Sequence, residues 1–117
     1  MNKKFKDLVP GNSLYILFIN PVNDEPVGVL NCIVSSINDN KTVVGVQYVS
    51  REDKSKMETG YFRVNPESYI NESLKENKEH RMEALFETKI DAIDNYIRYC
   101  EDKIQQYKNN INQLSKI

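Results

Sequence analysis

The chain has little of the residue types on which catalysis and cofactor binding most often depend. It contains no tryptophan, a single histidine (His80) and two cysteines (Cys32 and Cys100) in 117 residues. One histidine and two distant cysteines do not supply a tetrahedral zinc set. A cysteine–histidine nucleophile pair could only join Cys32 or Cys100 to His80, and the predicted position of Cys100 on the apolar stripe of a helix argues against it. The four glycines are isolated from one another, so no phosphate-binding loop is predicted. We therefore expect a protein that is not an enzyme and holds no metal or cofactor.

Long apolar runs and a strong excess of one charge are also missing. No stretch of about 18 apolar residues occurs, so the sequence predicts no membrane-spanning helix. The basic N-terminus resembles a secretory signal, but Asp7, Pro10 and Gly11 interrupt its apolar run and no small-residue cleavage site follows. We therefore expect a cytoplasmic protein whose two cysteines are buried free thiols. The formal net charge is −1 at pH 7, and no segment has the basic excess that non-specific nucleic-acid binding requires.

The first two thirds of the chain contain a succession of strand-like segments. Aromatic and β-branched residues are concentrated at residues 13–19, 27–37, 42–50 and 57–64. The connections between these segments are short and rich in turn-forming residues, which is typical of an antiparallel meander. The third segment carries apolar residues on both of its faces, so the sheet must either curl or be covered. One glycine lies inside each of three strands, where glycine often marks a bulge or a bend: Gly28, Gly45 and Gly60.

A fifth strand is predicted at residues 80–87. There, Met82, Ala84 and Phe86 alternate with two glutamates, Glu83 and Glu87. The intervening residues 65–78 begin with an Asn-Pro signal and are expected to form one or two short helical turns. The alternative is one continuous helix from about residue 67 to the C-terminus. Acidic residues at the extended heptad positions disfavour such a helix as a coiled coil, but they do not exclude a helix without a seam.

A long helix is predicted from about residue 89 onward. Thr88 and Asp91 form a variant of the capping box, in which the acid also lies in the first turn, where the helix dipole favours it. From there to the C-terminus, apolar residues recur at alternating spacings of three and four, as in a coiled coil. These residues are Ile90, Ile93, Ile97, Cys100, Ile104, Tyr107, Ile111 and Leu114.

This apolar stripe is too long for the strands alone to cover. About 28 residues make a helix on the order of 40 Å long, whereas a six-residue strand spans about 20 Å. At least half of the stripe therefore needs another partner, and self-association is the simplest solution. The mixed residues at every second stripe position leave dimers, trimers and antiparallel arrangements open. Two alternatives are a helix whose first half folds back on the barrel, and a combination of folding back and association.

Two features carry a family resemblance. The segment LVPGNSLY at residues 8–15 resembles the approach to the first strand of Src-homology-3-like and Tudor-like small barrels. The chain places the barrel strands first, then the segment LFETKIDA at residues 85–92, then a terminal helix. In this order of elements it is similar to small uncharacterised proteins of bacteriophages and gut bacteria. The resemblance implies a small barrel, and a phage protein that is either a virion component or an inhibitor of a host defence protein, but no assigned activity.

The candidate partner-binding residues gather around the third and fourth strands. They combine aromatic and basic side chains: Tyr48, Arg51, Lys54, Lys56, Tyr61 and Arg63. Such a combination is typical of barrels that bind nucleic acid, although the near-zero net charge favours structural roles for these side chains.

Together these patterns predict an α+β protein with two parts. A five-stranded antiparallel Src-homology-3-like barrel is expected at residues 1–87, and an oligomerising coiled-coil helix at residues 88–117. We expect a non-enzymatic protein-interaction module that forms a homo-oligomer and binds a protein partner of unknown identity. The alternative is a small nucleic-acid-binding accessory protein that uses the barrel face.

Overall fold

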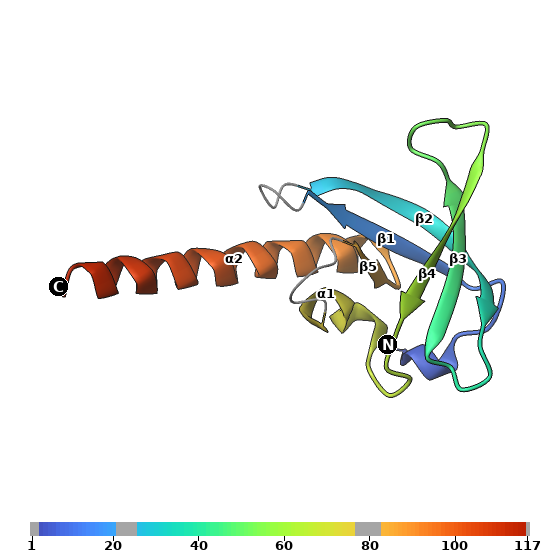
Figure 1. Ribbon diagram of the computed structural model, residues 1–117, viewed down its shortest axis with the longest axis horizontal. Coiled ribbons are helices and arrows are strands. Elements are labelled where there is room, and N and C mark those ends of the chain that lie inside the picture. The colour runs from blue at the N-terminus through green and yellow to red at the C-terminus, as the bar shows by residue number, and fades with distance from the viewer. Residues whose placement is uncertain (1–2, 21–25, 77–82, 117) are drawn as a thin grey trace.

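The computed structural model describes residues 3–20, 26–76 and 83–116 of the chain. In chain order the elements are η1 (Phe5–Asp7), β1 (Ser13–Ile19), β2 (Pro26–Ile37), β3 (Val43–Val49), β4 (Met57–Arg63), η2 (Ile70–Glu72), α1 (Ser73–Glu76), β5 (Glu83–Phe86) and α2 (Lys89–Leu114) (Figure 1). All five predicted strands, the short helical insertion and the long terminal helix are confirmed. The first residues of the predicted fifth strand, including His80 and Met82, lie outside the described ranges.

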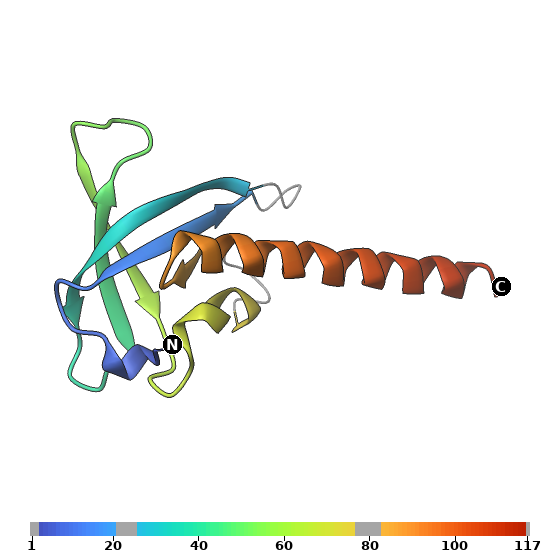
Figure 2. The same ribbon diagram turned by 180° about the vertical axis from the view of Figure 1, so that it is seen from behind.

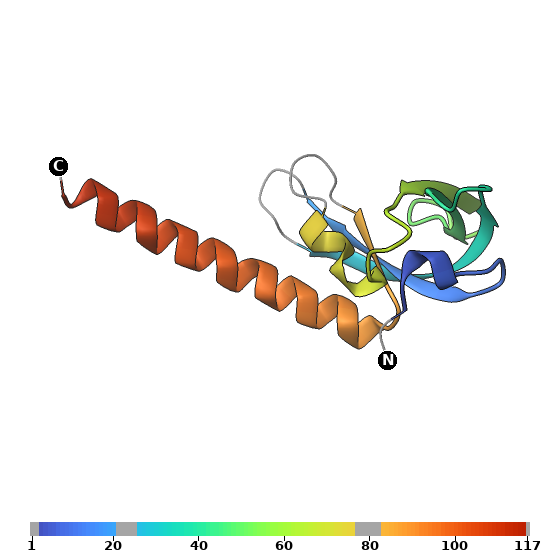
Figure 3. The same cartoon turned by 90° about the horizontal axis from the view of Figure 1, so that it is seen from below.

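The five strands form one antiparallel sheet in the order β4-β3-β2-β1-β5. The sheet is strongly curved and therefore has a concave and a convex side, as the view from below shows (Figure 3). Because β4 and β5 are the two edges of the sheet, the predicted barrel is a half-barrel. Register shifts occur between Phe18 and Ile19 on β1 and between Val34 and Ser36 on β2.

Gly45 on β3 lies at the bulge in β2. Ser36 pairs with Gly45 directly after the register shift. A Cβ atom at Gly45 would collide with the Ser36 hydroxyl and would lie 3.1 Å from Cε1 of Tyr61 on β4. The glycine therefore allows two neighbouring strands to approach closely at the bulge. By contrast, Gly60 pairs with Val46 in regular register, so this glycine marks no bulge.

The concave side of the half-barrel is filled by an inner core. Its twelve buried residues are Phe5, Leu8, Leu14, Ile16, Phe18, Cys32, Val34, Val44, Val46, Phe62, Ile70 and Leu85. Phe5 of η1 and Ile70 of η2 come from outside the sheet and are almost completely buried. Backbone hydrogen bonds join their segments: the Phe5 N–H donates to Ser68 O and the Ile70 N–H donates to Lys3 O, each at 3.0 Å. The two short helices therefore extend the inner core beyond the strands.

A second core lies on the convex side, between the sheet and α2. Its buried residues are Leu17, Ile19, Leu74, Ala84, Phe86 and Ala92. Both faces of β5 are thus buried, because Leu85 points into the inner core while Ala84 and Phe86 face α2. The shared face of Ala84 and Phe86 was correctly predicted.

The helix α2 begins where the sequence places it. The Thr88 Oγ1 atom accepts a hydrogen bond from the Asp91 N–H at 3.1 Å, which caps the helix that starts at Lys89. Its first turns pack against the sheet, and the rest projects away from the half-barrel (Figure 2). The molecule is consequently elongated, with principal extents of 55 × 34 × 23 Å. No helix in the described parts of the chain is long and apolar enough to cross a membrane.

Candidate functional site

The predicted heptad residues form an exposed apolar stripe along α2. We call these eight residues the α2 seam: Ile90, Ile93, Ile97, Cys100, Ile104, Tyr107, Ile111 and Leu114. The exposed fraction of its seven large apolar side chains runs from 45% at Ile93 to 70% at Leu114. Cys100 is half-buried. A contiguous exposed apolar surface of this kind often marks a site at which another protein binds.

A different stripe of α2 packs against the sheet. Ala92 is buried, and Tyr96 and Tyr99 are half-buried against the second core, on the convex side of the sheet. The two tyrosine rings stack with their centroids 6.2 Å apart, and the Lys103 ammonium lies 5.1 Å from the centroid of the Tyr99 ring. We call Ala92, Tyr96 and Tyr99 the packing stripe. At about 100° per residue, the centre of this stripe lies roughly 90° around the helix axis from the centre of the seam.

The sheet therefore holds the helix without using the seam. The first turns of α2 pack on the half-barrel, as both alternatives weighed from the sequence expect, but they do so through the packing stripe and not through the seam. The sequence pattern did not single out the packing stripe, because its two tyrosines and one alanine are less apolar than the neighbouring isoleucines. Their spacing of four and three, which places them on one face, was the signal that could have revealed them.

The second half of α2 has no support from the half-barrel. Every residue from 104 to 116 is exposed, and this part of the helix extends away from the strands in both side views (Figures 1 and 2). An isolated helical segment of this length is marginal in water. A partner on the seam would supply the packing that the segment lacks.

The candidate binding residues of the half-barrel do not form one surface. Tyr61 pairs with Gly45 and Arg63 with Val43, whereas Tyr48 pairs with Glu58. Because neighbouring residues of a strand point to opposite faces, Tyr48 lies on the concave side and Tyr61 and Arg63 on the convex side. Tyr61 is 66% exposed, while Tyr48 packs against the inner core.

Tyr48 belongs to a closed cluster at one end of the inner core. Its ring centroid lies 5.9 Å from that of Phe18, and the Arg51 guanidinium lies 4.3 Å from the centroid of the same Phe18 ring. Burial, together with the negative charges of Glu58 and Glu83, raises the pKa of Tyr48. Arg51 and Tyr48 therefore cover this end of the inner core.

The two lysines of the predicted surface lie in the loop between β3 and β4. Lys54 and Lys56 are both exposed. The Lys56 Nζ atom lies 3.8 Å from Asp53 Oδ2, an exposed ion pair of small energetic value. With Tyr48 and Arg51 on the concave side and Tyr61 and Arg63 on the convex side, the half-barrel has no continuous aromatic and basic face made from these six residues.

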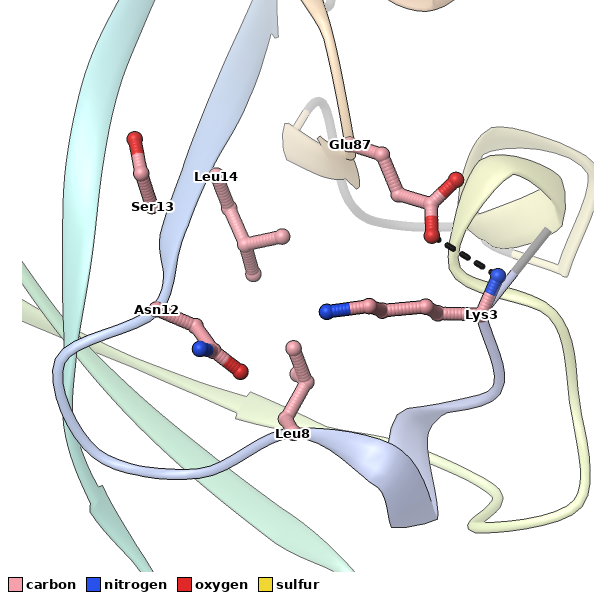
Figure 4. Close-up of a pocket in the computed structure, with 6 residues that line it drawn as sticks. All are labelled: Lys3, Leu8, Asn12, Ser13, Leu14 and Glu87. Atoms are coloured by element: carbon pink, nitrogen blue, oxygen red, sulfur yellow. Dashed lines mark hydrogen bonds between the residues drawn. The ribbon is translucent and has the colours of Figure 1, made fainter. Parts of the chain in front are cut away.

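A shallow pocket of about 160 Å³ opens beside the start of β1 (Figure 4). Lys3, Leu8, Asn12, Ser13, Leu14 and Glu87 line it. The backbone N–H of Lys3 donates to Glu87 Oε1 at 2.7 Å, and the Asn71 side chain donates to Glu87 Oε2 at 3.2 Å. Ligand pockets usually exceed about 300 Å³. These contacts fix the N-terminal segment and η2 to the residue that follows β5, and the pocket is too small for most organic ligands.

The cysteines have different environments. Cys32 is buried in the inner core, as predicted, and burial raises the pKa of its thiol to about 12. Cys100 is half-buried on α2, so the expectation of a buried thiol was wrong there. Within the described ranges, no group of three or more histidine, cysteine, aspartate or glutamate side chains is placed to hold a metal ion. His80 lies outside those ranges.

Comparison with family models, with curated proteins and with solved structures finds no match to this chain. The resemblance to phage and gut-bacterial proteins stays a prediction.

Proposed function

We propose that this protein is a non-enzymatic interaction module that self-associates through the α2 seam and thereby displays its half-barrel in more than one copy. The observation that supports the proposal is the separation of the two stripes of α2. The packing stripe fixes the helix to the sheet, and the seam, which carries the coiled-coil pattern, stays exposed.

A second copy of the chain is the partner that best fits the seam. A heptad stripe is self-complementary, since each apolar residue fits a hole between residues of an identical helix. All four residues at the first heptad position are isoleucine, a residue that parallel two-stranded coiled coils accept well there, while the mixed residues at the other core position leave trimers and antiparallel pairs open. These residues are Ile90, Ile97, Ile104 and Ile111.

The charges beside the seam are compatible with that pairing. In a parallel dimer, Lys89 of one copy lies near Asp94 of the other and attracts it. Lys103 would repel Lys108 in the same register. However, the Lys103 ammonium lies against the Tyr99 ring, on the packing side of its own helix, which reduces this repulsion.

Self-association would make the module multivalent. Each added half-barrel raises the effective concentration for a partner that has repeated or oligomeric binding sites, without any new contact in the individual complex. A repetitive assembly would therefore be bound much more tightly than an isolated subunit of the same assembly.

Sedimentation equilibrium of the full chain tests the proposal. The mass of one chain is 13.6 kDa. The proposal predicts the mass of two or more chains at micromolar concentration, with dissociation on dilution. A single-chain mass throughout the accessible concentration range would contradict it.

A further inference from the structure

The two edges of the half-barrel differ in how their backbone groups are bonded. At the β5 edge, the Ser73 hydroxyl donates to Leu85 O at 2.6 Å and accepts the Leu85 N–H at 2.8 Å. The Asn71 Oδ1 atom accepts the Glu87 N–H at 2.9 Å. Side chains of η2 and α1 thus occupy the positions that a further strand would take, so this edge is closed within the chain.

The β4 edge has no such cover in the described parts of the chain. The Val64 N–H donates to Thr42 O, and Lys56 O accepts from the Ser50 N–H, each at 2.9 Å. Even-numbered residues of this strand therefore bond to β3, and the odd-numbered residues direct their N–H and C=O groups away from it. The odd-numbered residues are Met57, Thr59, Tyr61 and Arg63. No backbone hydrogen bond joins them to another described segment.

Apart from one acid on its concave side, the strand β4 also lacks the usual features that prevent edge pairing. It is seven residues long, contains no proline and pairs with β3 without a register shift. Natural edge strands are commonly short, bulged or interrupted by proline or by an inward-pointing charge. Glu58 is the one acid on β4, and the Ser50 hydroxyl donates to its Oε1 atom at 2.9 Å.

We infer that β4 is a docking edge for an extended segment of another protein, which adds to the half-barrel as an antiparallel sixth strand. Main-chain hydrogen bonds to Thr59 and Tyr61 supply the affinity in this mode of binding, and neighbouring side chains supply the specificity. The convex side of β4 carries a single charge, that of Arg63, next to the exposed Tyr61 ring. The matching segment has an acidic residue opposite Arg63 and β-branched or aromatic residues opposite Thr59 and Tyr61.

A separate protein fits this edge better than a second copy of the chain does, because the convex side of a second β4 offers no acid to Arg63. The helix α2 contacts β1 and β5, which lie at the other end of the strand order from β4. Copies joined through the α2 seam therefore leave the β4 edge free. The inference rests on the half-barrel being an interaction module, but it does not depend on whether α2 self-associates.

Amide hydrogen exchange and NMR titration of the full chain test this inference. In the free protein, the amides of Thr59 and Tyr61 should exchange quickly, while those of Gly60 and Phe62 are protected. The probe is a soluble peptide of about nine residues in which valine and threonine alternate after an N-terminal glutamate. Its addition should protect the odd-numbered amides and shift their resonances. Protection of these amides in the free protein, or the absence of any β4 shift at saturating peptide, would overturn the inference.

Variants separate edge binding from other contacts. Thr59→Pro removes an outward N–H that β3 does not use and should abolish peptide binding, whereas the matched Thr59→Ala variant should retain it. A peptide with lysine in place of the glutamate should bind about threefold more weakly to the unmodified chain. Arg63→Glu should reverse that preference and provides a test even if the proline variant fails to fold. An unchanged preference would contradict pairing beside Arg63.

The oligomeric state shows whether a second copy of the chain, and not another protein, occupies the β4 edge. The variant Ile97→Asp with Ile104→Asp disrupts the seam and should bind the peptide as the unmodified chain does. If this variant still dimerises and its odd-numbered β4 amides are protected without peptide, a second copy of the chain occupies the edge and the inference is wrong. Failure of seam association with intact peptide binding would contradict the proposed self-association alone.

Discussion

The hydroxyl group of Ser73 bonds to both backbone groups of Leu85, donating to the carbonyl oxygen at 2.6 Å and accepting the N–H at 2.8 Å. Ser73 is 8% exposed and Leu85 is 1% exposed, so water has little access to either group. A single side chain thereby satisfies two buried polar groups that would otherwise need a strand as their partner. This contact closes the β5 edge of the sheet to a further strand, whereas the β4 edge is open.

Replacing Ser73 by alanine should destabilise the fold by about 2 kcal/mol, because the N–H and C=O of Leu85 lose their partner in a buried position. Urea unfolding followed by circular dichroism gives the free energy of unfolding. Ser35→Ala is the matched control, since Ser35 is exposed on β2, and its effect should stay below about 0.5 kcal/mol. Equal effects of the two substitutions would show that the contact with Leu85 contributes no more to the free energy of unfolding than an exposed serine does.

A side chain at Gly45 should also lower stability. Gly45→Ala places a Cβ atom against the Ser36 hydroxyl and the Tyr61 ring, which should cost about 1–3 kcal/mol of unfolding free energy. Gly28→Ala is the control, because nothing lies within 4 Å of a Cβ atom built there. Thermal unfolding of the two variants should give a clearly lower melting temperature for Gly45→Ala alone. A similar loss at Gly28 would argue against a special role for the close approach at the bulge.

The buried thiol of Cys32 should be unreactive while the protein is folded. Burial raises its pKa from 9.0 to about 12, so the reactive thiolate is scarce at neutral and mildly alkaline pH. The neutral thiol stabilises the fold fully below about pH 9, and this contribution is lost as the pH rises toward 12. In the variant Cys100→Ser, which leaves Cys32 as the sole thiol, a thiol reagent should react only after denaturation. Rapid labelling of the folded variant would contradict the burial of Cys32.

Disulfide cross-linking through Cys100 should reveal the orientation of the helices. Parallel pairing in register places the Cys100 side chains of two copies opposite each other in the seam, so mild oxidation should produce a covalent dimer. Antiparallel pairing that matches all eight seam positions places Cys100 opposite Ile104 and produces none. Cys100→Ser should remove the cross-linked band. An associated protein that forms no cross-link would contradict the parallel arrangement.

The sequence was sufficient where the physical signal is local. The cap at Thr88, the start of the helix and the strand segments follow from hydrogen bonding and side-chain periodicity over a few residues, and all are confirmed. The seam was predicted in the same way, and its exposure shows that the half-barrel does not use it.

Features that depend on how distant segments meet were not predicted. Tyr48 and Tyr61 were assigned to one surface because they lie on neighbouring strands, but the pairing of Tyr48 with Glu58 places them on opposite faces. The role of Ser73 depends on the approach of β5, which follows it by about ten residues. The incomplete closure of the sheet is likewise a property of strand pairing, and no single segment encodes it.

The most direct test of self-association through the seam compares three proteins by sedimentation equilibrium. The unmodified chain should sediment as an oligomer. The variant Ile97→Asp with Ile104→Asp should sediment at the single-chain mass of 13.6 kDa, because each change places a charge in the apolar interface. The control Gln105→Asp with Asn112→Asp adds the same charge on an exposed face away from the seam and should remain oligomeric. An unchanged mass in the Ile97 and Ile104 variant would contradict association through the α2 seam.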